Sequence, residues 1–367
     1  MASSSEELHE LESRLDPRLL RALDMVAPGT SLREGIDNII HARSGGLLVI
    51  GEPDEISFLF SGGIRLDVDY TPALLYQVAK MDGAIILDPG ATTISWANVQ
   101  LMPDPTILSM ETGTRHRTAE RVSKQTDALV IAISARRDVV SLYVEGIKYI
   151  LEDIPSVLSK ANQGLATLEK YRVRLDQVSA RLTAAEFGGE AVLYDALAAL
   201  QRVEMVTRMA SEVERYIIEL GSEGRLIEMQ LEETVVGVMA DRVALVRDYA
   251  REDTEQGTER ILEELAALPH EEVLDFGRLA ELLGYERKTS TVEFPIAPRG
   301  YRALSRISRL PRLVAQRVVH RYGELDSIMG ASEHELASID GVGETRARDI
   351  REGLRRLQEV DLVDRYT

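Results

Sequence analysis

The feature that most constrains the fold is an abrupt change in apolar periodicity near residue 154. Before it, short apolar runs such as "ALVIAIS" (residues 128–134) are bounded by glycine, proline and other turn residues, a pattern that predicts strands. After it, from residue 156 to about 284, leucines recur at helical spacing and Pro269 is the only proline, which predicts long helices. The chain is therefore predicted to be an α+β multidomain protein.

The first region is predicted to hold a mixed β-sheet flanked by helices, because its strands alternate with single helices. Two pairs of strands are close enough in the sequence to form hairpins, so the sheet is not purely parallel. The predicted helices cover residues 32–42, 72–80 and 118–125. The predicted strands cover residues 46–50, 57–60, 84–88, 93–99, 128–134 and 139–144.

The length of 367 residues suits two or three domains. Residues 285–301 form a polar stretch punctuated by glycine and proline, which is typical of a linker, and a compact helical unit follows. We therefore predict a mixed-sheet domain over residues 1–154, an all-α spacer over residues 155–290, and a helical domain over residues 291–367.

Composition excludes several classes of protein. Cysteine is absent, which excludes disulfides and thiolate zinc sites, and the six histidines form no H-x-x-x-H pair. No apolar run approaches membrane-spanning length and no signal-peptide pattern is present, so we expect a cytoplasmic protein without a membrane partner. The net charge of −18 argues against a surface that binds nucleic acid everywhere.

One segment departs from this acidic average. Residues 299–321 contain seven arginines and no acidic residue, so we expect any nucleic-acid contact to be concentrated there. Arg299 and Arg302 precede the first helix of this unit, and the alternative for these two is that they only decorate the linker.

The C-terminal unit contains two glycines that flank a small apolar residue between two predicted helices. Such a turn exposes backbone N–H groups at a helix N-terminus, which can hold a DNA phosphate without reading sequence. The segment resembles a helix–hairpin–helix module, and residues 307–332 resemble its partner copy, with Leu310-Pro311 at the hairpin position. The alternative is an ordinary helical turn whose glycines act as C-caps. The candidate DNA-binding residues are Gly341, Val342, Gly343, Arg346, Arg309 and Arg312.

In the first region, "ETGTRHRTAE" (residues 111–120) places a flexible turn and three consecutive basic side chains before a predicted helix that Thr118 opens. Donors at a helix N-terminus suit a polyphosphate, and the alternative is a solvated basic turn. Consecutive positive side chains at a helix start oppose the helix dipole, so a counter-anion is expected. The candidate phosphate-binding residues are Gly113, Thr114, Arg115, His116, Arg117 and Thr118.

Two further motifs carry polar side chains at strand ends. Asp82 and Gly83 precede a buried strand, where the carboxylate can bind a divalent cation or accept a hydroxyl proton, although such a pair is more commonly a turn. Ser134 ends another strand and is followed by Ala135 and two arginines, which alone would predict a hairpin loop with surface arginines.

Taken together, "DGA" at residues 82–84, "GTRHRT" at residues 113–118, and the serine with arginines at a strand end resemble the diadenylate cyclase domain. With the helical spacer and the C-terminal hairpin unit, the entire chain resembles the bacterial DNA-integrity scanning family. This resemblance implies that two ATP molecules are condensed into cyclic di-3′,5′-adenosine monophosphate, with release of two pyrophosphates and use of Mg²⁺ or Mn²⁺.

The resemblance also implies roles for single residues. Asp82 would lie near the ribose 3′-hydroxyl and the metal, and Gly83 and Ala84 would contact the nucleotide through their backbones. Arg115 and His116, together with their neighbours at residues 113–118, would hold the triphosphate. Ser134 and an arginine after it would reach the leaving pyrophosphate. Family members often place that arginine directly after the serine; here Arg136 and Arg137 follow Ala135, and the three-residue spacing favours Arg137.

The product has two-fold symmetry, so two cyclase domains must face each other. The resemblance implies a homo-octamer with central cyclase domains, a nucleoid-associated location, and binding of branched or damaged DNA that lowers cyclase activity. Two alternatives belong to other classes: a non-catalytic, nucleotide-sensing DNA-binding scaffold, and a nucleotidyltransferase that modifies a DNA end. The scarcity of further carboxylates near the motifs argues against a polymerase-like two-metal site.

Overall fold

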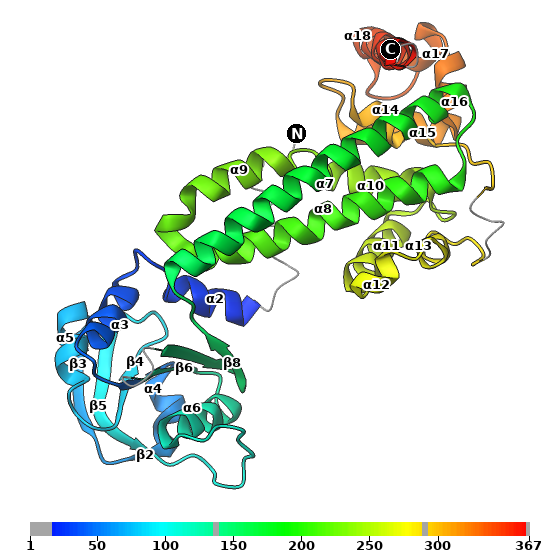
Figure 1. The fold of residues 1–367 in the computed structure, drawn as a ribbon. Helices are drawn as coiled ribbons and strands as arrows, with labels where there is room; N and C mark the ends of the chain where they lie inside the picture. The colour runs from blue at the N-terminus through cyan, green and yellow to red at the C-terminus, as the bar shows by residue number, and fades with distance from the viewer. Residues whose placement is uncertain (1–16, 135–138, 288–292, 365–367) are drawn as a thin grey trace. The chain divides into compact units, whose positions relative to one another are not determined.

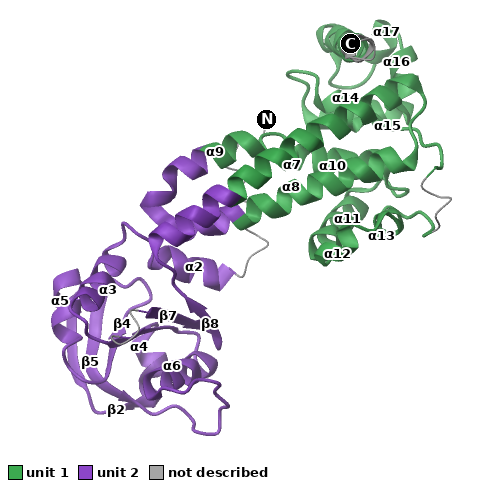
Figure 2. Cartoon of the chain, viewed as in Figure 1, with its two compact units in different colours: residues 1–14, 164–212, 230–367 green, residues 15–163, 213–229 purple. Residues whose placement is uncertain are grey.

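The computed structural model describes residues 17–134, 139–287 and 293–364 of the chain (Figure 1). It divides into two compact units, shown in Figure 2. One comprises residues 15–163 with residues 213–229, and the other residues 164–212 with residues 230–367 and 1–14. The long helices α7 (Ile154–Gly188) and α8 (Leu193–Leu220) each contribute residues to both units.

A mixed sheet forms the centre of the first unit (Figure 1). Among the described residues its strand order is β2-β5-β4-β1-β6-β7-β8, and β3 pairs with β5 as well. β1 runs parallel to β4 and antiparallel to β6, which confirms a mixed sheet. The strands are β1 (Gly46–Ile50), β2 (Phe60–Ser61), β3 (Ile64–Asp69), β4 (Ala84–Leu87), β5 (Thr93–Leu101), β6 (Leu129–Ser134), β7 (Val139–Val144) and β8 (Ile147–Ile150).

Helices cover both faces of this sheet because successive strand residues point to opposite sides. In β1, Leu48 and Ile50 pack in one core cluster, with residues of α2 (Pro17–Met25), α3 (Ser31–His41) and α5 (Pro72–Val78). Leu47 and Val49 pack in a second cluster, with α4 (Pro53–Ile56) and α6 (Thr114–Gln125). Every β1 side chain is buried, so a polar side chain finds space only beyond the strand ends.

Three local predictions differ from the structure. Residues predicted as a strand at 57–60 form the 3₁₀ turn η1 (Ser57–Leu59) before the short β2. The prediction missed β3 and β8 because both are largely exposed strands, and residues such as Asp67 and Lys148 interrupt their apolar pattern. The helix predicted to open at Thr118 begins at Thr114 instead, because Gly113 takes the extended N-cap conformation and accepts a bond from the Arg117 amide.

The chain after residue 153 is helical, as predicted for the spacer. The leucine stripe of α7 is buried at Leu165, Leu168, Leu175 and Leu182, whereas Leu158 is partly exposed. The helices that follow α7 and α8 are α9 (Arg225–Val235), α10 (Val238–Tyr249), α11 (Glu255–Ala267), α12 (His270–Val273) and α13 (Phe276–Leu282). Within the described ranges, no helix is both long and apolar enough to cross a bilayer.

The last part of the chain contains two helical hairpins joined by α16 (Leu325–Gly330). The first hairpin is α14 (Tyr301–Ser305) with α15 (Arg312–Tyr322), and the second is α17 (Glu333–Ala337) with α18 (Gly343–Asp364). Both hairpins contribute to one apolar core, which includes Leu304, Val318, Leu336, Ala347 and Ile350.

Candidate functional site

The strand order brings two of the predicted motifs to one end of the sheet. β1 lies between β4, which is parallel to it, and β6, which is antiparallel. The starts of β1 and β4 therefore lie beside the end of β6, and the register pairs Gly46 with Ile133. Asp82 immediately precedes β4, and Ser134 ends β6. Both residues consequently lie at the same end of the sheet, on either side of the β1 N-terminus.

Arg115 connects the third motif to this end of the sheet. Its Nη1 donates a hydrogen bond to the carbonyl of Ile133, 3.1 Å away, one residue before Ser134. Gly45, just before β1, leaves the room for this guanidinium, because a Cβ at Gly45 would lie 2.2 Å from Arg115 Nη1. Arg115 is thus held at the end of the sheet where Asp82 and Ser134 also lie.

The N-terminus of α6 is suited to an anion. Gly113 is its N-cap and offers no capping side chain, and the first turn contains no acidic residue. Arg115 and Arg117 add positive charge at the end where the helix dipole is already positive. An anionic ligand at this helix start would relieve that repulsion. Thr114 is exposed, and Thr118, in the second turn, is half-buried.

The side chain of His116 contacts a residue of β7. Its Nδ1 lies 2.9 Å from the hydroxyl of Tyr143, a fully buried residue of β7. Beside this pair, Glu111 forms an ion pair of 2.8 Å with Lys148. Burial alone would raise the pKa of Glu111, but hydrogen bonds from Lys148 and Tyr143 and the nearby His116 lower it below the usual value. Burial, with the negative charge of Glu111, raises the pKa of Tyr143, so its hydroxyl stays protonated.

Gly83 is required by the fold as well as being a candidate ligand contact. Its φ is +98°, and a Cβ there would lie 2.9 Å from the Asn98 carbonyl carbon and the Val99 oxygen of β5. The side chain of Ala84 is buried in the core on the α6 side, which leaves only its backbone for a ligand. Asp82 is exposed beside them. Arg137, with Ala135 and Arg136, lies outside the described residues.

In the described parts of the chain, no three His, Cys, Asp or Glu residues are grouped so that they could hold a metal ion. Among the described residues, Asp82 therefore belongs to no preformed cluster of three ligands. Mg²⁺ in nucleotide sites is commonly bound by one or two carboxylates together with substrate phosphates and water. An exposed carboxylate at the same end of the sheet as the α6 N-terminus fits that mode.

The second predicted site is the turn between α17 and α18. Gly341 and Gly343 have φ values of +85° and +57°, the left-handed region that L side chains rarely adopt. Val342, between them, is buried, so its side chain serves the core. Arg346 Nη1 donates to the Gly341 carbonyl at 2.6 Å, which closes the turn. The turn is therefore ordered by its own contacts, which include a bond from the Val342 amide to the Ile339 carbonyl.

The first hairpin repeats this turn with an arginine. The Leu310 amide donates to the Ile307 carbonyl, as the Val342 amide does to Ile339. Arg309 has a φ of +63°, so it takes the position that the first glycine has in the second turn. Arg309 is exposed in the first turn, at the position that corresponds to Gly341 in the second turn. The predicted candidate Arg312 is the first residue of α15 and is also exposed.

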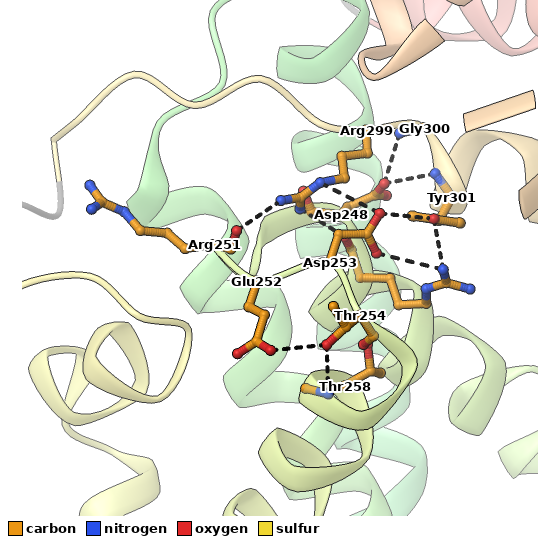
Figure 3. A network of polar contacts seen from close by, with 11 residues as sticks. Asp248, Arg251, Glu252, Asp253, Thr254, Thr258, Arg299, Gly300 and Tyr301 are labelled. Atoms are coloured by element: carbon orange, nitrogen blue, oxygen red, sulfur yellow. Dashed lines mark hydrogen bonds and ion pairs between the residues drawn. The ribbon is translucent and has the colours of Figure 1, made fainter. Parts of the chain in front are cut away.

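The interpretation of Arg299 and Arg302 as linker decoration is wrong. Arg302 is 2% exposed and forms an ion pair with Glu186 of α7. Arg299 Nη1 donates to the carbonyls of Arg247 and Asp248, both at 2.9 Å, at the end of α10 (Figure 3). Arg302 thus neutralises a buried carboxylate, and Arg299 binds the carbonyls at the C-terminus of a helix.

Arg306, a third member of the run, hydrogen-bonds Thr183. The exposed arginines that remain are Arg309, Arg312, Arg317 and Arg321.

Two family models match the chain. The model described as DisA bacterial checkpoint controller nucleotide-binding matches residues 33–148, and the model of the DisA bacterial checkpoint controller linker region matches residues 151–292. The first match includes Asp82, Arg115 and Ser134. The chain therefore contains a nucleotide-binding domain followed by a helical linker region.

Full-length relatives extend this match. The chain is 51% identical to the DNA integrity scanning protein DisA of Carboxydothermus hydrogenoformans, covering 94% of this chain and 98% of that protein. It is 49% identical to the protein of the same name from Symbiobacterium thermophilum, covering 92% and 95%. For that of Clostridium botulinum (strain 657 / Type Ba4), identity is 47% and coverage 95% and 98%. The chain belongs to the DisA family.

Proposed function

We propose that the chain is a diadenylate cyclase that condenses two ATP molecules into cyclic di-AMP and two pyrophosphates. The observation that supports this most directly is the contact of Arg115 with the backbone beside Ser134, within a nucleotide-binding domain of the DisA family. Arg115 belongs to the first turn of α6, so this contact supports a triphosphate site at the same end of the sheet as Asp82. Phosphoryl transfer depends on positioning and charge stabilisation, which these groups can supply.

In the proposed reaction, the 3′-oxygen of one ATP attacks the α-phosphorus of the other, and pyrophosphate leaves. Arg115, His116 and the amides at the start of α6 hold the triphosphate and stabilise its charge. Asp82 orients the 3′-hydroxyl and accepts its proton. Asp82 would also hold Mg²⁺ or Mn²⁺ jointly with the substrate phosphates, and the ion would contribute positive charge at the phosphates.

A single domain offers one such site, and the product needs two attacks. We therefore propose that two sheet domains face each other in a homo-oligomer, for which the octamer is the expected form. The cytoplasm, close to the nucleoid, is the location that this activity and DNA binding would share.

The cyclase proposal is tested by incubating the purified chain with ATP and Mn²⁺ and separating the nucleotide products. We expect cyclic di-AMP and pyrophosphate in a one-to-two ratio. Asp82→Asn should abolish product, whereas Asp54→Asn, which neutralises an exposed carboxylate of α4, should not. Bound but unchanged ATP would favour a nucleotide-sensing scaffold. Transfer of nucleotide to labelled DNA ends would favour the end-modifying alternative.

We further propose that the C-terminal hairpins bind DNA phosphates through the turn at residues 341–343. The name of the relatives, DNA integrity scanning protein, and the left-handed glycines of this turn support the proposal. Branched or damaged DNA is the expected ligand, and its binding is expected to lower cyclase activity.

The DNA proposal is tested with Gly343→Asp. Aspartate tolerates left-handed backbone, and the space around a Cβ at Gly343 is open, so the fold should persist while the carboxylate repels phosphate. Gly189→Asp is a matched control, because Gly189 has φ +67° and equally open surroundings at the end of α7. We expect weaker binding of branched DNA for the first variant only. Equal binding by both variants would contradict the proposal.

A further inference from the structure

A cleft of about 570 Å³ lies in the second unit, against α15. One of its walls is the outward stripe of this helix, formed by Leu313, Gln316, Arg317, His320 and Arg321. Their spacing of three and four residues places them on one face, opposite the buried stripe of the same helix. The stripe contains no acidic residue.

The other wall of the cleft comes from α10 and α14. The Arg247 guanidinium lies 4.0 Å from the centre of the Tyr301 ring, and its Nη2 donates to the Tyr301 hydroxyl at 2.7 Å. Asp253, the carboxylate of this wall, accepts a hydrogen bond of 3.0 Å from the same hydroxyl and lies 3.5 Å from Arg247 (Figure 3). Its charge is thus paired with that of Arg247, and Arg317 and Arg321 are the further cationic residues of the lining.

Arg317 joins this cleft to the candidate DNA-binding turn. Its Nη1 donates to the carbonyl and the carboxylate of Asp340, at 2.8 and 2.7 Å, directly before Gly341. His320 and Arg321, further along α15, make no ion pair or side-chain hydrogen bond with another described residue and are exposed. The cleft therefore lies beside the turn, connected to it through Arg317, and offers further donors along α15.

We infer that this cleft binds the sugar–phosphate backbone of the DNA strand that the turn holds, with His320 and Arg321 as additional phosphate contacts. The inference rests on the proposed DNA binding by the hairpins and extends it to a site that the turn itself does not contain. A cleft with these cationic residues beside the turn would lengthen the footprint on the same DNA molecule.

The shape of the cleft favours a strand over a free nucleotide. Leu313 to Arg321 spans eight residues of helix, about 12 Å at a rise of about 1.5 Å per residue. Each strand of a duplex carries one phosphate for about every 3.4 Å of helix axis, so a row of this length along the axis faces three or four phosphates. A single triphosphate would occupy only part of this row. Leu313 lies at one end of this row and is 67% exposed, so its side chain can cover the apolar surface of a sugar.

The test measures binding of the full chain to a labelled four-way DNA junction at several salt concentrations by fluorescence anisotropy. For Arg321→Gln we expect about tenfold weaker binding, and a slope of log K against log salt that is shallower by about 1, because one phosphate contact is lost. His320→Gln in addition should weaken binding further, because a second donor of the cleft is lost. Arg355→Gln removes an exposed arginine of α18 and is the matched control, expected to leave the slope unchanged.

The outcomes separate this inference from the proposed function. If Gly343→Asp weakens binding and Arg321→Gln leaves both affinity and salt slope unchanged, the inference is wrong and DNA binding by the turn stands. If the wild-type chain binds no DNA, both fail. A third outcome is that millimolar ATP displaces DNA from the wild type but not from the Arg321→Gln variant. The cleft would then be a nucleotide site, which also overturns the inference.

Discussion

The two arginine-rich regions of this chain use their charge differently. In residues 115–117 the arginines lie at one helix start, and Arg115 is fixed by a backbone carbonyl at the end of the sheet. In residues 299–321 the arginines are spread over a linker, a turn and two helices, and Arg302 is completely enclosed. An arginine-rich segment therefore predicts a region of positive charge. It does not predict whether that charge binds a ligand or pairs with the protein's own carboxylates.

The first prediction tests the enclosed member of the C-terminal run. Arg302→Met leaves Glu186 buried without its ion-pair partner, a change that typically costs about 3–5 kcal/mol. In calorimetry, we expect the unfolding of this unit to occur about 10 °C lower, from a shift of about 2–4 °C per kcal/mol. Arg312→Met, on the exposed start of α15, should change the melting temperature little. Equal effects of both would contradict the division of the run.

The second prediction concerns Asp248, the carboxylate that accepts hydrogen bonds from the backbone of the same segment. Asp248 accepts bonds from the amides of Gly300, Tyr301 and Arg302, and burial, then the nearby Glu186, raises its pKa to about 7. The folded state then binds the proton more tightly than the unfolded state does. Stability from this group is full at low pH and is lost as pH rises from about 4 to about 7.

The change is at most about 4 kcal/mol, from about 1.4 kcal/mol for each pH unit of the shift. The measurement is the free energy of unfolding of the wild type relative to Asp248→Asn across this pH range. We expect the free energy of unfolding of the wild type to decrease relative to that of the variant as pH rises. The opposite trend would show that the three amides and Arg302 outweigh burial and keep Asp248 charged.

What the sequence predicted depended on local pattern. The strands of the sheet centre, such as β1 and β6, are continuous apolar runs and were predicted well, whereas the exposed β3 was not. Motif spacing indicated Arg115 as a phosphate ligand, but its bond to Ile133 depends on strand order, which no local pattern contains.

The same limit applies to the environment of single residues. The partnership of His116 with Tyr143 joins residues 27 positions apart on different elements. Arg302 could not be assigned to the interior, because Glu186 lies 116 residues earlier in the chain. In both cases the missing information was the tertiary partner.

The third prediction concerns the fixed arginine of the sheet domain. Arg115→Ala removes a charge from the proposed triphosphate site, and loss of one such electrostatic contact typically lowers turnover about 100-fold or more. Because Arg115 is exposed, we expect the melting temperature to change by little, in contrast to Arg302→Met. Rates of cyclic di-AMP formation and calorimetry on the same sample give both values. A large loss of stability with full activity would reverse the comparison.

The smallest expected effect tests the support behind His116. Tyr143→Phe removes the hydroxyl that lies 2.9 Å from His116 Nδ1 and that also bonds Glu111, and loss of each such hydrogen bond costs about 1 kcal/mol. We expect about a fivefold lower kcat with little change in KM, because His116 would still bind phosphate but in a less fixed orientation. Tyr149→Phe is the control, since that hydroxyl bonds Glu219 at 2.7 Å. Equal losses in both variants would mean that tyrosine hydroxyls act through stability alone, and that Tyr143 does not position His116.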